Sequence, residues 1–270
     1  MENSRHRPAS QPDGTRPDLS GEVTRPERPG EVSRAELPGE VAELVGELSE
    51  TASPSRRRRL SAAISRLTGR SRRAGWHGAQ SGGRWLTSQV LAMAPRLPVR
   101  DQQTLRAQFP GLNPEELADA LIRGSARAAA AVGASAGVAM VLPLPAAPVE
   151  IAIETLAVVG IEIKLVAELH EVYGMRAPGS MAERMLAYVA AWAHRRGVAF
   201  GPAGLMLAVG SPLRRRLQRR LIARAGRSAL SLGPLFSGAV AGAALNRHET
   251  RRLGTDVRND LRRRSPDQMR

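Results

Sequence analysis

The chain has 270 residues and a formal net charge of +15, and 42% of its residues are hydrophobic although only 3% are aromatic. It contains no cysteine, which excludes disulfides, thiolate metal sites and a cysteine nucleophile. A core this poor in aromatic residues must be built from Ala, Leu, Val, Ile and Met, several of which are strong helix formers. We therefore expect an all-α protein, a compact multi-helix bundle preceded by a disordered N-terminal tail.

Residues 1–59 form the predicted tail. They are rich in Pro, Glu, Arg, Ser and Gly, and the tripeptide GEV recurs in them at nine-residue steps. Their apolar residues are too sparse to offset the entropy lost on ordering. Only residues 39–50, GEVAELVGELSE, have helical spacing, which is the pattern of a segment that folds on a partner.

Helical patterns follow from residue 60 onward. Residues 60–79 predict a short helix and a basic linker, and residues 80–264 predict an all-helical domain that begins with a helix over 83–94. Residues 265–270 are expected to be a disordered C-terminus.

Capping residues mark several helix ends. Asn113 precedes the sequence PEEL, so it is a predicted N-cap with proline at the first helical position and two glutamates in the first turn. Ser180 and Glu183 have the spacing of a capping box, and the helix that they start is expected to end at Gly197. Gly174 is a predicted left-handed C-cap of the preceding helix.

The last third of the chain continues the helical pattern. Helical segments are predicted over 201–210, 211–226 and 228–246, followed by a separate charged helix over 247–264. Residues 195–270 hold 17 arginines against 4 acidic residues, so the positive charge is concentrated here. Arginine usage this heavy reflects either codon bias or a need for bidentate phosphate contacts.

Three windows, 128–149, 197–213 and 228–246, carry no charge. The first and third are long enough to span a bilayer, but both are dominated by alanine and glycine, which gain little on transfer to lipid. Two GxxxG pairs, at Gly133 and Gly238, let helix backbones approach closely in membranes and in alanine-rich bundles. A water-soluble bundle and a membrane-spanning protein with one or two such spans both remain open.

The segment 147–173 is the most apolar predicted helix, and it carries one polar stripe. Its remaining circumference is almost wholly aliphatic, so we expect this helix at the centre of the bundle, with arginines elsewhere meeting its carboxylates. The stripe is either a solvated face, a polar cleft that binds a ligand or a carboxylate metal site, although the Glu-x-x-His step of helical di-iron sites does not occur. The candidate cleft residues are Glu150, Glu154, Lys164, Glu168 and Glu171. Glu162 and His170 lie off the stripe.

No catalytic signature occurs in the chain. Serine hydrolase, P-loop, Rossmann and HExxH patterns are missing, and the five histidines have no ligand spacing. We therefore assign no catalytic, cofactor or metal residues, and an enzyme using the glutamate-lined cleft remains an alternative.

Residues 211–227, SPLRRRLQRRLIARAGR, predict a cationic amphipathic helix with a leucine stripe opposite its arginines. It is either a bundle helix with solvated arginines, a contact for an anionic lipid surface or a contact for nucleic acid. The candidate anion contacts are Arg215, Arg216, Arg219, Arg220 and Arg227.

The sequence LPLPAAPVE, the helix closing on Tyr173 and Gly174, the capped helix after it and the late glycine-rich segment resemble the EcsC family of bacterial proteins. The residues that carry the resemblance are Pro143, Pro145, Glu150, Tyr173 and Gly174. It would cover residues 105–264, and it implies the helical fold together with a loose association with bacterial membrane physiology. Family members usually have aspartate where this chain has Glu150.

These observations favour a non-catalytic interaction protein without cofactors, peripherally associated with the cytoplasmic face of a bacterial membrane. The lack of an N-terminal hydrophobic region predicts a cytoplasmic location with membrane association. The expected partner is an anionic membrane surface or an acidic protein. Non-specific nucleic-acid binding is the alternative, because basic charge alone is enough for it. It is less favoured, because few aromatic residues are available to stack on bases. The sequence does not specify an oligomeric state.

Overall fold

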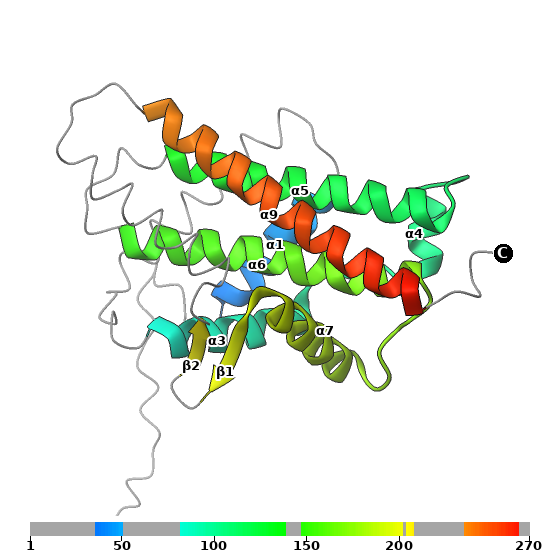
Figure 1. Cartoon of the computed structure of the whole chain (residues 1–270). Helices are drawn as coiled ribbons and strands as arrows, with labels where there is room; N and C mark the ends of the chain where they lie inside the picture. Colours follow the sequence, from blue (N-terminus) through cyan, green and yellow to red (C-terminus); the bar gives the residue numbers. More distant parts are fainter. Residues whose placement is uncertain (1–35, 51–81, 139–146, 202–203, 208–234, 265–270) are drawn as a thin grey trace, which may run out of the picture.

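A computed structural model describes residues 36–50, 82–138, 147–201, 204–207 and 235–264. This part of the chain is a helical bundle with one short β-hairpin, which confirms the all-α prediction (Figure 1). The elements are α1 (Leu37–Glu50), α3 (Gly82–Met93), the 3₁₀ turn η1 (Ala94–Arg96), α4 (Gln102–Gln108), α5 (Pro114–Val138), α6 (Ala147–Val172), α7 (Met181–Arg196), β1 (Val198–Gly201), β2 (Gly204–Leu207) and α9 (Leu235–Arg264). Several predicted features lie outside the described residues: the linker 60–79, Pro143, Pro145, the five candidate anion contacts Arg215, Arg216, Arg219, Arg220 and Arg227, and residues 265–270.

Helix α6 lies at the centre of the bundle, as its apolar circumference predicts. It contacts α1, α3, α4, α5, α7 and α9. From Ala152 to Leu169 every side chain is buried except that of Thr155, which is half-buried. A helix enclosed in this way is stabilised by burial on all sides, whereas a surface helix buries only one stripe.

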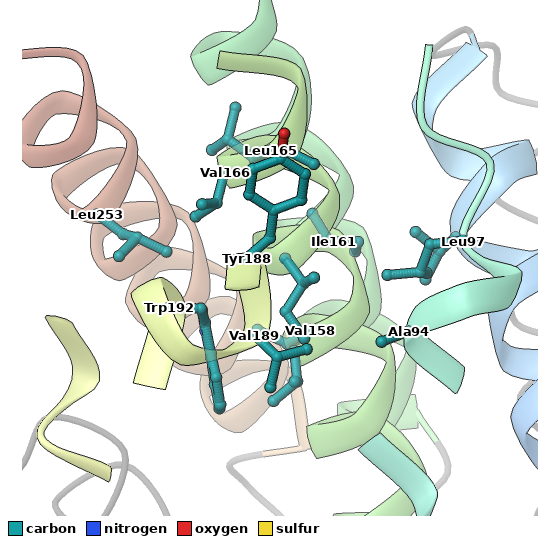
Figure 2. Packing of buried hydrophobic residues seen from close by; sticks show 14 of the residues in the cluster. Ala94, Leu97, Val158, Ile161, Leu165, Val166, Tyr188, Val189, Trp192 and Leu253 are labelled. Carbon is teal, nitrogen blue, oxygen red and sulfur yellow. The ribbon is translucent and has the colours of Figure 1, made fainter. Parts of the chain in front are cut away.

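The core consists of aliphatic side chains with a few aromatic ones. In Figure 2, the ring of Tyr188 of α7 lies beside Leu165 and Val166 of α6, Trp192 of α7 lies below it in the same cluster, and Leu253 of α9 borders the cluster. The Trp192 side chain is 1% exposed. The scarce aromatic residues are thus placed where one large side chain fills the space between three helices.

Helices α5 and α9 run antiparallel and make the most extensive helix contact in the described structure (Figure 1). A Cβ atom at Gly133 would lie 2.7 Å from the carbonyl oxygen of Gly242, and one at Gly254 would lie 2.8 Å from a side-chain carbon of Ile122. Glycine is therefore required at position 133, because a side chain there would overlap the α9 backbone. The small-residue pattern around Gly133 serves helix packing within the bundle.

The predicted helix ends are confirmed. Asn113 Oδ1 accepts from the Glu116 amide at 3.0 Å, and Ser180 and Glu183 form the full capping box. Gly174 and Gly197 both have positive φ, at 66° and 61°. Beyond Gly174, the Met175 amide donates to the His170 carbonyl oxygen at 2.8 Å, which completes a Schellman motif.

Residues 37–50 correct the prediction that the whole of 1–59 is a disordered tail. They form α1, whose Val41 and Val45 side chains are 0% exposed against the bundle core. The helical spacing of 39–50 was correct, and the partner on which it folds is the chain's own helix α6, where a Cβ at Gly160 would lie 2.9 Å from Val45.

Two predicted boundaries are wrong in the last third of the chain. Residues 198–201 and 204–207 form an antiparallel hairpin where a helix over 201–210 was expected, because Gly197 reverses the chain and Val198 starts an extended segment. The segments 228–246 and 247–264 were expected as separate helices, but α9 runs unbroken across Asn246. The Asn246 side chain is fully buried and donates to the carbonyl oxygen of Ala129, so this residue packs within the helix and does not end it.

Within the described ranges, no helix is both long enough and apolar enough to span a bilayer.

The glycine contact between α5 and α9 predicts opposite effects of two alanine substitutions in the same helix. Gly133→Ala should lower the free energy of unfolding by about 1–3 kcal/mol because its Cβ overlaps the α9 backbone. Gly124→Ala, where a Cβ meets nothing within 4 Å, should raise it by about 0.5–1 kcal/mol through helix propensity. Urea denaturation measures both, and equal effects of the two substitutions would contradict the close crossing.

Candidate functional site

Four carboxylates of α6 are buried and bind polar partners from the surrounding elements. Glu154, Glu162, Glu168 and Glu171 are between 2% and 7% exposed. A buried carboxylate without partners would destabilise the fold by several kcal/mol. The solvated-face interpretation is therefore wrong for these residues, and the expectation that arginines meet the α6 carboxylates is confirmed for Glu162, Glu168 and Glu171.

Glu162 joins α6 to α7 and α9. Its carboxylate accepts from Trp192 Nε1 at 2.9 Å, from Arg196 Nε at 3.0 Å and from Thr250 Oγ1 at 3.0 Å. Arg196 also donates to the carboxylate of Glu249 at 3.1 Å. Every donor here comes from an element other than α6, so this buried network fixes how three helices pack against one another.

Glu168 joins α6 to the loop before α4. Its two oxygens accept from Nε and Nη2 of Arg100, each at 2.8 Å, in the bidentate geometry that favours arginine. Lys164, one helical turn earlier, also donates to Glu168. Arg100 is held from its other side by Gln108, whose side-chain oxygen accepts from Nη1 at 2.8 Å.

Glu171 joins α6 to the loop before α7. It accepts from Nε and Nη2 of Arg176, both at 2.7 Å, and this contact raises the pKa of the Arg176 guanidinium. Arg176 is 48% exposed at its side chain, whereas that of Glu171 is 8% exposed. The pair therefore lies at the boundary between the core and solvent.

A pocket of about 450 Å³ opens at this boundary, between the α1 end, the loop before α4, the last turns of α6 and the start of α7. Lys164 and Glu171 of the predicted cleft line it, and Glu168 lies between them under Arg100. The pocket wall also contains Asp101, which caps α4 by accepting from the Thr104 amide at 2.8 Å, a contact that lowers the pKa of Asp101.

The predicted cleft residues do not form one continuous site. Glu154 lies at the crossing of α5, α6 and α9, where Asn246 donates to it at 3.3 Å. Glu150 lies in the first turn of α6, and the structure does not describe its side chain. The stripe separates because the elements that pack on α6 change along its length, from α5 and α9 to α4 and α7.

The arginine partners were not identified from the sequence. Arg100, Arg176 and Arg196 lie 68, 5 and 34 residues from the carboxylates that they bind, so helical periodicity carries no signal for the long-range pairs. One local signal was available: Asp101 followed by Gln-Gln-Thr is an N-cap pattern, and it predicts α4.

The described residues contain no cluster of metal-ligating side chains, and His170 of α6 is a packing residue. No three His, Asp or Glu side chains of this part of the chain lie close enough to hold a metal ion together. His170 Nδ1 lies 2.7 Å from the Val166 carbonyl oxygen and its ring packs on Tyr188. Burial lowers the pKa of His170, so its imidazole is neutral at pH 7 and acts as a packing residue.

Charges on α9 are segregated by side. With Asn246 at 0° and about 100° per residue, the six arginines from Arg247 to Arg263 fall between about 100° and 260°. The three carboxylates fall between about 280° and 320°. Glu249 and Asp260 lie on that acidic side and bind Arg196 and Arg195 of α7. Six of the seven arginines of α9 therefore lie on its outer side, and the seventh, Arg264 in the last turn, falls at about 0° and pairs with Asp260.

Helix α5 extends this basic surface. Its contact with α9 places Ile122 next to Gly254, so Arg123 lies level with the middle of the arginine-bearing part of α9. Arg258 of α9 is half-buried and pairs with Asp119 of α5. We define the arginine face as the exposed residues of α5 and α9 that border this contact: Arg123, Arg127, Arg247, Arg251 and Arg262.

The Glu162 network predicts a specific cost for removing one neutral donor. Thr250→Val keeps the shape of the side chain but removes one hydrogen bond to a buried carboxylate, so the free energy of unfolding should fall by about 1–3 kcal/mol. Thr255→Val in the same helix is the control, because Thr255 is half-buried, and its effect should be within about 0.5 kcal/mol. Equal effects in thermal or urea unfolding would show that Thr250 does not support Glu162.

Comparison of the whole chain with protein-family models, with curated proteins and with solved structures gives no match. Function is therefore inferred from the two features that this chain places on its surface. These are the arginine face of α5 and α9 and the polar pocket at the end of α6.

Proposed function

We propose that the protein is a non-catalytic, EcsC-like helical interaction protein that binds the anionic cytoplasmic surface of a bacterial membrane through its arginine face. The observation that carries this proposal is the charge segregation on α9. Two carboxylates on the acidic side of α9 form ion pairs with Arg195 and Arg196 of α7. Arg247, Arg251 and Arg262 make no ion pair with a described residue.

The arginine face has the dimensions of a surface contact. Arg247 and Arg262 are 15 residues apart, or about 22 Å along the helix. A basic residue near an anionic leaflet contributes about 1 kcal/mol, so five arginines can hold a soluble domain at a membrane when they act together. Such binding is electrostatic and weakens as salt is added.

A lipid surface fits the face better than nucleic acid does. Val240 is 66% exposed and lies at about 120° on α9, on the same side as the arginines and two turns before Arg247. An exposed aliphatic residue gains free energy by entering a headgroup layer but not by meeting a phosphate backbone. Among the described residues Tyr173, Tyr188 and Trp192 are buried. Trp85 and Phe109 are partly buried against the core and lie on elements other than α5 and α9, so they offer no stacking platform beside the arginine face.

Co-sedimentation with lipid vesicles tests the proposal. The full chain should bind vesicles containing about 30 mol % phosphatidylserine and should dissociate from them at high salt. It should not bind vesicles of pure phosphatidylcholine. Arg247→Gln with Arg251→Gln should weaken binding by about tenfold or more. Arg96→Gln with Arg106→Gln removes the same net charge from exposed sites on other elements and should have a much smaller effect.

Three results would contradict the proposal. Equal loss of binding in both double variants would show that only net charge matters. Tighter binding to duplex DNA than to anionic vesicles at the same salt would make nucleic acid the partner. Full binding by the face variant, with loss of binding on replacing Arg215, Arg216, Arg219 and Arg220 by glutamine, would place the contact in segment 211–227 instead.

A further inference from the structure

The pocket at the end of α6 has the size and composition of a small-molecule site. Its volume of about 450 Å³ lies within the range of ligand pockets. Its walls come from α1, α4, α6, α7 and the loops between them, so its shape depends on the folded bundle and not on one loop. The proposed membrane contact on α5 and α9 does not use these residues.

Cationic groups outnumber carboxylates in the pocket. Arg100, Lys164, Arg176 and Arg184 line it. The opposing carboxylates are Asp101 and Glu171 in the wall and Glu168 beneath it, and each of these accepts hydrogen bonds from protein groups. Among the described residues of the pocket, one positive charge is therefore left in excess, in a place partly shielded from solvent.

Arg184 carries that excess charge. It is half-buried and pairs with no carboxylate among the described residues, and Nη1 donates to the Gly179 carbonyl oxygen at 2.8 Å. Its other hydrogen bond within the described residues is a long one to the Met181 sulfur at 4.0 Å. A guanidinium has five N–H donors, so most of those on Arg184 have no strong acceptor in the described structure.

Tyr188 supplies a neutral donor at the same place. Its side chain is buried, and its oxygen accepts from the Ala177 amide at 3.1 Å. Burial raises the pKa of Tyr188, so the hydroxyl keeps its proton at pH 7. No described residue accepts that proton, so the hydroxyl is able to donate into the pocket.

Apolar groups complete the wall. Pro98, Val99 and Met185 line the pocket together with Met181, which is 51% exposed at its edge. A ligand bound here would therefore meet arginine and tyrosine donors on one side and aliphatic or thioether surface on the other.

We propose that this pocket binds a small organic anion, whose carboxylate or phosphate group is held by Arg184, Arg176 and the Tyr188 hydroxyl, and whose carbon skeleton lies against Pro98, Val99 and Met185. The planar guanidinium fork binds either oxyanion in bidentate geometry. Arg176 keeps its pairing with Glu171 through Nε and Nη2, which leaves Nη1 to face the ligand.

Calorimetric titration of the full chain tests this site with three probes of similar shape: phenyl phosphate, benzoate and the neutral benzamide. Sodium chloride is adjusted so that ionic strength stays constant. Saturable binding of at least one anion is expected, with no binding of benzamide. The anion that binds more tightly identifies the class as phosphate or carboxylate.

Substitutions at two residues locate the site. Arg184→Gln should weaken the binding of that anion by about tenfold or more, and Tyr188→Phe should weaken it to a smaller extent. Arg184→Lys keeps the charge without the fork and should give an intermediate value. Circular dichroism and the unliganded melting temperature confirm that each variant is folded. Arg247→Gln with Arg251→Gln should leave anion binding unchanged while weakening vesicle binding, so the two proposals fail separately.

The proposal is overturned if neither anion binds to the unsubstituted chain. It is also overturned if binding is unaffected by Arg184→Gln in the folded variant, or if benzamide binds as tightly as benzoate.

Discussion

The bundle depends on one constraint: its most deeply buried helix carries carboxylates that must be neutralised inside the core. Glu162 and Glu168 are each 2% exposed, and each binds an arginine that reaches α6 from another part of the chain. The charge pairs add a requirement to this packing, because a displaced pair leaves an uncompensated charge in the core. They therefore determine where α7, α9 and the loop before α4 lie against α6.

The same constraint accounts for the surface of the molecule. Arg195 and Arg196 of α7 draw the acidic side of α9 toward the bundle through Asp260 and Glu249. The arginines of α9 consequently point outward and join those of α5. At the other end of α6, Arg100 and Arg176 pair with the α6 carboxylates, while Arg184 has no such partner among the described residues. Both proposed binding surfaces thus carry arginines that are not needed to neutralise the buried carboxylates.

Local patterns predicted local structure well. Helix ends are determined by contacts within a few residues, so they can be predicted from the sequence alone. This is the case for Asn113, for Ser180 with Glu183, and for Gly174. Apolar periodicity predicted α6 as the central helix for the same reason.

Long-range partners were not predictable, because nothing near Glu162 in the sequence indicates that Arg196 will meet it. The packing of α1 into the bundle was not predicted, because α1 has few apolar residues and these are buried only together with the apolar side chains of α6. The hairpin was missed because four-residue strands show too little alternation. The resemblance to the EcsC family stays a prediction.

A double-mutant cycle on Glu162 and Arg196 tests the central claim most directly. Glu162→Gln, Arg196→Met and the combined variant are unfolded in urea, and the coupling free energy is the difference between the combined effect and the sum of the single effects. The account predicts that Arg196→Met alone costs about 3–5 kcal/mol and that adding Glu162→Gln recovers a substantial part of that loss, since the carboxylate is then no longer an unpaired charge in the core. Additive effects would show that the two residues contribute independently, and the buried charges would then not determine how the helices pack.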